Sequence, residues 1–448
     1  MAIAKMKVDA AALALALVSS LFLASGVQAQ LWEPYKEGNT KLDVNLEAQI
    51  AVFNNKDAWF GEDEELFGED LNRWAENTLE IGLFGETDLL GGILFGELSY
   101  VYSGTYGYDA SAVDLSSDDP WDIILEQGYL GWRSGGVTEG LGESAITVKA
   151  GYLDYSIATG LLIRNGGGNG GDRGAWWIAP RRTFRDALLV SINTNGWLIE
   201  AFRLENRSRP GSLDNQITGG NVEYEFFDPG LKLGASYYEV SAVRRTTSED
   251  LPDYWTYSLR ANYAPTQALS FAGEYVEQGD NGLDADGYWI SGEYAFNAPS
   301  LYDPRLSYRW AHFSGDDLNN PKDQGFRPTA YGFTDYGYWF QGEIAGNYPL
   351  ENTNLNSHQF RVELYPSEKL TVNLVYYIFE LDQKQLDGVP LSSDDYGEEF
   401  DLAFDYEIND HLVMNVTLGI LMPGDAAKEA TGGDDDWLYS MVYFGYFF

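Results

Sequence analysis

Apolar and polar residues alternate with period two in one segment after another of this chain of 448 residues. The segment LDVNLEAQIAVF, Leu42 to Phe53, places Leu, Val, Leu, Ala, Ile and Val on one face and Asp, Asn, Glu and Gln on the other. Segments 253–263, 305–313 and 411–421 repeat the pattern. Successive side chains of a β-strand point to opposite faces, so each segment predicts a strand with one apolar face.

The length of these segments separates two classes of β-protein. Strands of soluble sandwiches are usually about 5 or 6 residues long. Strands of about 10 residues are typical of transmembrane barrels, in which lipid covers one strand face and a polar lumen the other. Aromatic residues make up 15% of the chain, which also favours strands over helices. We therefore predict an all-β fold: a transmembrane antiparallel up-and-down β-barrel.

The N-terminal residues predict export. Two lysines within the first seven residues precede an apolar run from Ala10 to Ala24, and a small-residue cleavage site ends at Ala29. This is the pattern of a secretory signal peptide, so we expect residues 1–29 to be removed and residues 30–448 to form one barrel domain. The apolar run is shorter than the roughly 20 residues of a transmembrane helix. The chain contains no cysteine, which excludes a disulfide framework and thiolate metal sites.

Two kinds of connection alternate between the expected strands. Counting the segment 337–346 as a strand gives 19 strands, whereas bacterial single-chain barrels have an even number. Assigning that segment to a long loop over about 316–355, external or folded inward, leaves about 18 strands and places both termini in the periplasm. The last strand is expected over about 436–448. Short periplasmic turns are expected at 86–92, 193–196, 226–232, 263–268, 365–369 and 406–411, and long acidic external loops near 54–75, 104–122, 155–185, 279–286, 382–397 and 422–435.

The C-terminal quarter resembles a known family. Segment 397–448 has an acidic residue entering a strand, then a hairpin, then a Pro423-Gly424-Asp425 loop before the closing strand. It is similar to the end of the alginate export family of outer-membrane barrels. The resemblance implies a channel in the outer membrane of a Gram-negative cell that passes an anionic polysaccharide or oligosaccharide through an arginine-lined pore. The aromatic ending VYFGYFF is typical of outer-membrane barrels, and we expect the barrel-assembly machinery to recognise Phe448.

Arginine is concentrated in one segment of a chain whose formal net charge is -41. Between Gly160 and Pro210 lie eight arginines, no lysine and four acidic residues. Much of this segment is the loop between the fifth and sixth expected strands, which is long enough to fold into the lumen. The planar guanidinium donates two parallel hydrogen bonds to a carboxylate, and a ring of such groups favours anions in a pore. We expect the pathway to be lined by the loop residues Arg164, Arg173, Arg181, Arg182 and Arg185, and by Arg260, Arg305, Arg309 and Arg361 on inward strand faces.

Three interpretations of these arginines remain open. They line an anion pathway, they brace the barrel by pairing with lumen acids such as Glu47, Glu293 and Glu363, or some face outward and bind lipopolysaccharide. We expect Arg181, Arg182 and Arg185 to be loop residues in a wet lumen whose replacement costs little stability. Trp176 and Trp177 would stack on sugar rings or anchor the loop. The expected partners are outer-membrane lipid, lipopolysaccharide and an anionic saccharide, with no nucleic acid.

Other motifs are weak. Gly166, Gly168 and Gly171 satisfy a dinucleotide-binding pattern, but no amphipathic helix follows, so we interpret the run as a flexible loop. The stretch GLDADG resembles a calcium loop, yet Gly282 stands where the first carboxylate is needed. We expect no cofactor and no metal site.

An enzymatic alternative rests on His312 and Ser314, which share a strand face. Residues two apart on a strand lie about 7 Å apart at the backbone, so a hydrogen bond between the two side chains is unusual. We predict a channel without catalytic activity. The alternatives are a diffusion porin for nutrient uptake and, in another class, an outer-membrane lipid hydrolase. Lumen width separates them, because narrow barrels near 8 strands are filled by side chains, whereas about 18 strands leave room for a channel.

Overall fold

The computed structural model describes residues 35–111, 119–136, 140–206, 215–226, 230–242, 253–280, 282–332 and 341–448. The expected signal peptide, residues 1–29, and the loop arginines Arg207 and Arg209 lie outside these ranges.

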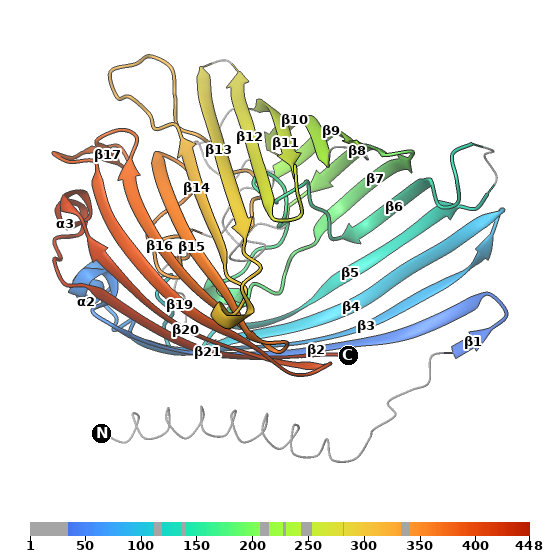
Figure 1. The fold of residues 1–448 in the computed structure, drawn as a ribbon, viewed down its shortest axis with the longest axis horizontal. Helices are drawn as coiled ribbons and strands as arrows, with labels where there is room; N and C mark the ends of the chain where they lie inside the picture. The colour runs from blue at the N-terminus through green and yellow to red at the C-terminus, as the bar shows by residue number, and fades with distance from the viewer. Residues whose placement is uncertain are drawn as a thin grey trace.

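Within the described ranges, 18 antiparallel strands form one closed barrel (Figure 1). Each strand pairs with the next along the chain, and the last, β21, pairs with the first, β2. The predicted fold class is therefore confirmed. The barrel strands are β2 (Thr40–Lys56), β3 (Arg73–Leu89), β4 (Gly92–Tyr106), β5 (Trp121–Ser134), β6 (Ile146–Leu153), β7 (Phe184–Thr194), β8 (Trp197–Glu205), β9 (Asn215–Phe226), β10 (Leu231–Ala242), β11 (Tyr254–Tyr263), β12 (Leu269–Asp280), β13 (Leu283–Ala295), β14 (Arg305–Phe313), β15 (Leu355–Ser367), β16 (Leu370–Leu381), β19 (Asp395–Asn409), β20 (Leu412–Pro423) and β21 (Trp437–Phe447).

The remaining elements are short. β1 pairs with the start of β2, and β17 with β18 forms a small hairpin in the loop after β16. No helix in the described part of the chain is long and apolar enough to cross a membrane. These elements are β1 (Tyr35–Glu37), β17 (Gln385–Leu386), β18 (Val389–Pro390), η2 (Ala58–Gly61), α2 (Asp63–Phe67), η3 (Gly171–Arg173), η4 (Pro299–Leu301) and α3 (Asp425–Thr431).

The connections follow the predicted alternation at all but one place. The β7–β8 turn illustrates the local chemistry: Asn195 and Gly196 have φ of 48° and 82°, the left-handed pair that a two-residue hairpin turn requires. The prediction of a long acidic loop at 279–286 is wrong, because β12 continues to Asp280 and β13 begins at Leu283. Leu283 and Ala285 are buried on one strand face, and the acids alternate with them on the other. The acidic composition concealed a period-two pattern, and the acidic residues of the stretch GLDADG belong to a strand and not to a solvated loop.

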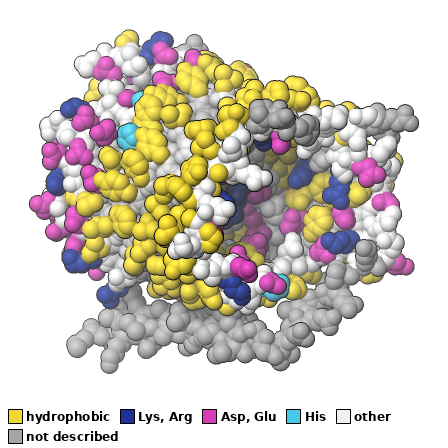
Figure 2. Space-filling view, viewed as in Figure 1, with side chains coloured by type: hydrophobic (Ala, Val, Ile, Leu, Met, Phe, Trp, Pro, Cys, Tyr) yellow, Lys and Arg dark blue, Asp and Glu magenta, His cyan; other side chains and the backbone are white. Residues whose placement is uncertain are grey.

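The outer face of the barrel is apolar. Along β3, Leu79, Ile81 and Leu83 are 41%, 52% and 42% exposed, and the same alternation recurs on neighbouring strands. Figure 2 shows hydrophobic side chains gathered over the part of the outer face that is visible in this view. Exposed apolar surface on this scale marks contact with a membrane. Apolar residues therefore face outward as predicted, but the inward face is not polar throughout, because Val375, Tyr377 and Phe379 are buried on it.

Two connections fold into the lumen and pack against each other. The first, residues 154–183, joins β6 to β7, and the second, described over residues 314–332 and 341–354, joins β14 to β15. The backbone amide of Arg164 donates a hydrogen bond to the carbonyl of Ala330 at 2.7 Å, which links the two infolded segments. Residues 341–346 are buried turns and not a barrel strand. Assigning about 316–355 to a loop was therefore correct, and of the two alternatives its described part is folded inward.

Candidate functional site

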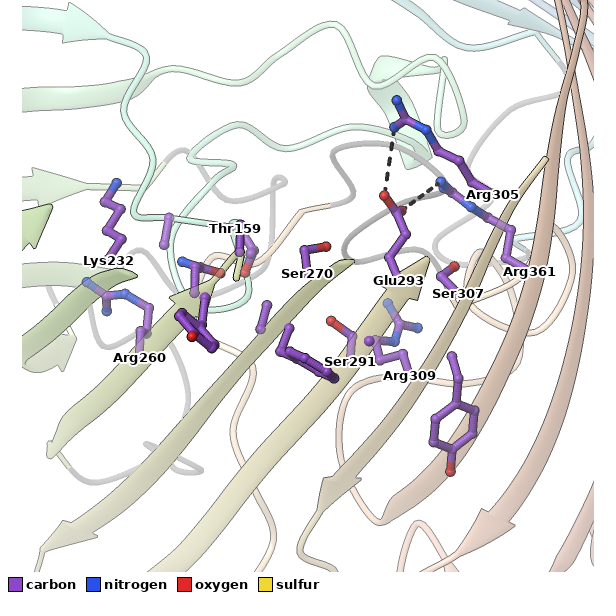
Figure 3. A pocket seen from close by; sticks show the side chains of 18 of the residues that line it. Thr159, Lys232, Arg260, Ser270, Ser291, Glu293, Arg305, Ser307, Arg309 and Arg361 are labelled. Atoms are coloured by element: carbon purple, nitrogen blue, oxygen red, sulfur yellow. Dashed lines mark ion pairs between the residues drawn. The ribbon is translucent and has the colours of Figure 1, made fainter. Parts of the chain in front are cut away.

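A cavity of about 1130 Å³ lies against the inner wall from β9 to β19 (Figure 3), and we call it the wall cavity. The four arginines predicted to point inward from strands all line it, because their neighbours in sequence, such as Leu259 and Phe360, are exposed on the outer face. Sequence analysis missed Lys232, although the alternation in LKLGASYYEV placed it on the polar face. The charged lining residues are Lys232, Arg260, Arg305, Arg309 and Arg361 with Glu223, Glu225, Glu293, Glu363 and Asp405.

Ion pairs connect adjacent strands at the β13–β15 side of the wall cavity. An Nη atom of Arg361 lies 3.1 Å from Glu363 and 3.9 Å from Glu293. Arg305 makes longer contacts with the same two acids, at 3.8 Å to Glu293 and 3.9 Å to Glu363. Figure 3 shows both guanidinium groups directed toward Glu293. These pairs brace the wall, as the second interpretation expects for Glu293 and Glu363.

Two further arginines of the wall are buried. Arg260 contacts Glu223 at 3.3 Å and Glu274 at 3.7 Å, and it donates to the hydroxyl of Ser258 at 2.7 Å. Arg309 is 1% exposed and donates to Oε1 of Gln341 in the second infolded segment at 2.9 Å. Arg260 thus connects strands, and Arg309 connects the wall to the infolded segment.

Two cations of the wall cavity, Lys232 and Arg305, are more exposed than the acids paired with them. Lys232 is 44% exposed, whereas its partner Glu223, 2.5 Å away, is 5% exposed. Arg305 is 45% exposed, and its partner Glu363 is 12% exposed. Five cations and five carboxylates line the cavity, so its formal charge is balanced. At these two pairs the cation is the more exposed partner, whereas Arg361 is 7% exposed beside Glu293, which is 32% exposed.

The five arginines expected in the loop do not act as one cluster. Arg185 lies in β7 and not in the loop, and it pairs with Glu205 at 2.7 Å. Arg164 pairs with Asp154 at 3.2 Å, and Arg173 lies 3.8 Å from Asp122. Each pair lies in a different part of the lumen wall or infolded segment. The expected common basic surface is therefore divided into separate ion pairs.

Arg181 does not line the solute pathway, contrary to the expectation from sequence. Its side chain is 0% exposed and donates to the hydroxyl of Ser103 at 2.5 Å and to the carbonyl of Arg173 at 3.2 Å. It does not reach the open lumen, so it cannot contact a passing solute. The expectation that its replacement costs little stability fails for the same reason, since removing a buried, hydrogen-bonded cation leaves a cavity and unsatisfied partners.

Arg182, the next residue, is exposed and belongs to a second cavity. This cavity of about 490 Å³ lies between the two infolded segments, and we call it the loop cavity. Arg164, Asn165, Trp176, Tyr331 and Asn347 also line it. Burial, followed by the charge of Glu351, raises the pKa of the Tyr331 phenol, so this group stays protonated.

The two tryptophans anchor the first infolded segment. The indole nitrogen of Trp176 donates to the carbonyl of Asn347 at 2.9 Å, and that of Trp177 donates to Glu343 at 3.0 Å. The Trp177 ring also packs against Phe53 and Tyr443 of the wall, with centroids 5.7 Å apart in both cases. Both residues therefore hold the infolded segments together, whichever solute passes them.

The remaining motifs have structural explanations. His312 shares a hydrogen bond with Asn356 at 2.8 Å, whereas the Ser314 hydroxyl donates to the carbonyl of Gln324 at 2.6 Å. The two side chains do not form a nucleophile–base pair. In the glycine run, a side chain on Gly167 would collide with the Arg181 carbonyl, so close packing explains that glycine. Across the described ranges, no group of three or more His, Asp or Glu side chains could hold a metal ion.

Comparison with known proteins supports the same class. The model of the alginate export family matches residues 232–438, which confirms the resemblance over that region. The solved outer-membrane protein OpdK of Pseudomonas aeruginosa is 14% identical, with a TM-score of 0.57 over 91% of this chain and 98% of that chain. OccK2 (OpdF) of Pseudomonas aeruginosa is 15% identical, with a TM-score of 0.57 over 91% and 97%.

OpdK has also been solved with vanillate, at 13% identity to this chain and a TM-score of 0.57, over 91% of this chain and 98% of that chain. No curated protein matches the chain in sequence. The fold is that of an outer-membrane porin, and both this fold and the matched family are those of channels and not of enzymes.

Proposed function

We propose that this porin-type barrel is a solute-selective diffusion channel for small hydrophilic carboxylates, uronic acids and their short oligomers among them. The observation that carries the proposal is the wall cavity, in which Lys232 and Arg305 are 44% and 45% exposed, whereas the carboxylates of Glu223 and Glu363 beside them are 5% and 12% exposed. A guanidinium or ammonium group that faces the lumen binds a solute carboxylate, and the hydroxyls of Ser270, Ser291 and Ser307 offer hydrogen bonds to sugar hydroxyls.

The infolded segments favour a small solute. Residues 154–183 and the described residues 314–332 and 341–354 occupy the lumen and are joined by hydrogen bonds, which narrows the path. The structural neighbour OpdK has been solved with vanillate, and vanillate carries a carboxylate. Both observations support selective diffusion of small anions over free passage of a polymer.

The second candidate is export of an anionic polysaccharide. It is favoured by the alginate export match, which covers residues 232–438 and hence most of the strands of the wall cavity. The two candidates differ in the size of the solute. A polymer exporter admits long uronate chains, whereas a diffusion channel excludes them.

We expect a weakly anion-selective channel when the purified protein is inserted into planar bilayers at moderate salt. Acidic external loops more than about 8 to 10 Å away are screened and do not cancel the lumen cations. Trigalacturonate should reduce the single-channel current at lower concentration than neutral maltotriose, and long uronate polymers should not cross. Strong cation selectivity with equal effects of the two trisaccharides contradicts the proposal, and passage of long polymers favours the second candidate.

We also propose that both termini and the short turns face the periplasm. Sequence tags inserted after Asp394 or Glu429, in the long loops, should bind antibody on intact cells. A tag in the 367–370 turn should bind only after permeabilisation. Whole-cell labelling of the turn tag would reverse the orientation.

A further inference from the structure

Two arginines line the loop cavity, and among the described residues only one of them forms an ion pair with a carboxylate. Arg164 places one Nη atom 3.2 Å from both oxygens of Asp154. Arg182 is exposed, and no carboxylate of the described residues forms an ion pair with it. It interacts electrostatically with Glu47 on β2, yet no ion pair closes between them. Its guanidinium fork therefore faces the lumen with its donors available.

The backbone of Arg182 is held on both sides. Oε1 of Glu126, on β5, accepts the amide hydrogens of Arg182 at 2.7 Å and of Thr183 at 2.9 Å. The Thr183 hydroxyl donates to the carbonyl of Glu126 at 2.8 Å. The carbonyl of Arg182 accepts the amide of Gly166 at 2.9 Å, from the glycine run of the same segment. Because Glu126 is 2% exposed, its carboxylate serves this loop and does not face a solute.

The surroundings of Arg182 fit a hydroxylated ligand. Amides of Asn165, Asn206 and Asn347 and the hydroxyl of Thr329 line the cavity. Its volume of about 490 Å³ falls in the usual range of about 300 to 1,000 Å³ for small-molecule sites. Because hydrogen bonds already hold the backbone of Arg182, little backbone freedom is lost when its side chain binds a carboxylate.

We infer that the loop cavity is a second solute site, separate from the wall cavity, which binds one carboxylate of a hydroxylated solute through Arg182, and that Glu126 is the residue that positions Arg182. The inference rests on the proposed function only in that a carboxylated solute must enter the lumen. Removing Glu126 has opposite consequences under two explanations. If Glu126 acts by its negative charge, replacing it strengthens the binding of an anionic solute. If Glu126 positions Arg182, replacing it weakens the binding of that solute.

The first test compares arginine variants in planar bilayers, with trigalacturonate as the probe. Arg182→Ala should raise the concentration that halves the single-channel current by about tenfold, the effect expected for a charge-assisted hydrogen bond. Arg203→Ala is the matched control, because Arg203 is an exposed residue of β8 that lines neither cavity. It should leave the block unchanged. An unchanged block in Arg182→Ala overturns the site.

The second test separates position from charge. Glu126→Gln removes the charge but keeps an acceptor oxygen for the two amides, so its block should equal or exceed that of the wild type. Glu126→Ala removes both and should weaken the block about as much as Arg182→Ala. A block in Glu126→Ala at least as strong as in the wild type overturns the positioning role. Should Glu126→Ala fail to fold, Arg182→Ala still decides the site, because its side chain is exposed.

Failure of the inference is distinguishable from failure of the proposed function. If trigalacturonate blocks the wild type and the block depends on Arg305 but not on Arg182, only the inference fails. If the wild type shows neither anion preference nor any block, the proposed function fails with it.

Discussion

Replacing Arg305 and Arg361 together with glutamine is expected to make the channel prefer cations. Each arginine contacts both Glu293 and Glu363, so the double substitution leaves these two carboxylates without their guanidinium partners. The wall cavity would then carry three cations against five carboxylates. Two charges about 4 Å apart interact by about 1 kcal/mol in water, so the anion-to-cation permeability ratio should fall roughly fivefold or more. Reversal potentials in a salt gradient measure this ratio.

The mirror-image control replaces Glu293 and Glu363 with glutamine. It removes the other halves of the same ion pairs and leaves five cations against three carboxylates. The permeability ratio should then move in the opposite direction, toward anions. If both double variants shift the ratio equally in one direction, loss of bracing and not charge controls permeation, and the wall arginines are structural.

Deleting Phe448 is expected to remove most of the folded barrel from the outer membrane. Phe448 and Leu46 exchange two backbone hydrogen bonds of 2.9 Å beyond the end of β21, at the seam where the last strand meets the first. Loss of these two hydrogen bonds lowers the free energy of unfolding by about 1 to 3 kcal/mol, at roughly 0.5 to 1.5 kcal/mol per bond. We also propose that the barrel-assembly machinery recognises this terminal aromatic residue. Heat-modifiable migration of the protein from isolated outer membranes reports the folded fraction.

Phe448→Tyr is the matched control, since it keeps the backbone pair and the aromatic ring. The ring lies 5.6 Å from the His411 ring, centroid to centroid, and is 45% exposed, so the added hydroxyl has room. This variant should assemble like the wild type, whereas Phe448→Asp should assemble poorly although its backbone can still pair. Wild-type levels of the deletion variant would show that closure and recognition rely on other residues.

Sequence alone determined the features that depend on the geometry of a single strand. Side-chain direction alternates every residue, so Arg260, Arg305, Arg309 and Arg361 could be directed inward from their apolar neighbours. Turn chemistry is equally local, and Asn195-Gly196 marked its hairpin without reference to the rest of the chain. The expectation of an even strand number removed 337–346 from the strands, and the described part of that segment, residues 341–346, is not a strand.

Only the tertiary structure decided what each charged side chain does. Arg181 and Arg182 are adjacent, yet one is buried against Ser103 and the other faces the loop cavity. The residue that orients this loop, Glu126, lies 56 residues before Arg182. A local sequence pattern does not predict a contact between residues that far apart in the chain, because the contact depends on how the loop folds back onto the barrel wall. Composition likewise shows an acidic chain, but the fold gathers as many cations as carboxylates around the wall cavity and leaves Lys232 and Arg305 more exposed than Glu223 and Glu363 beside them.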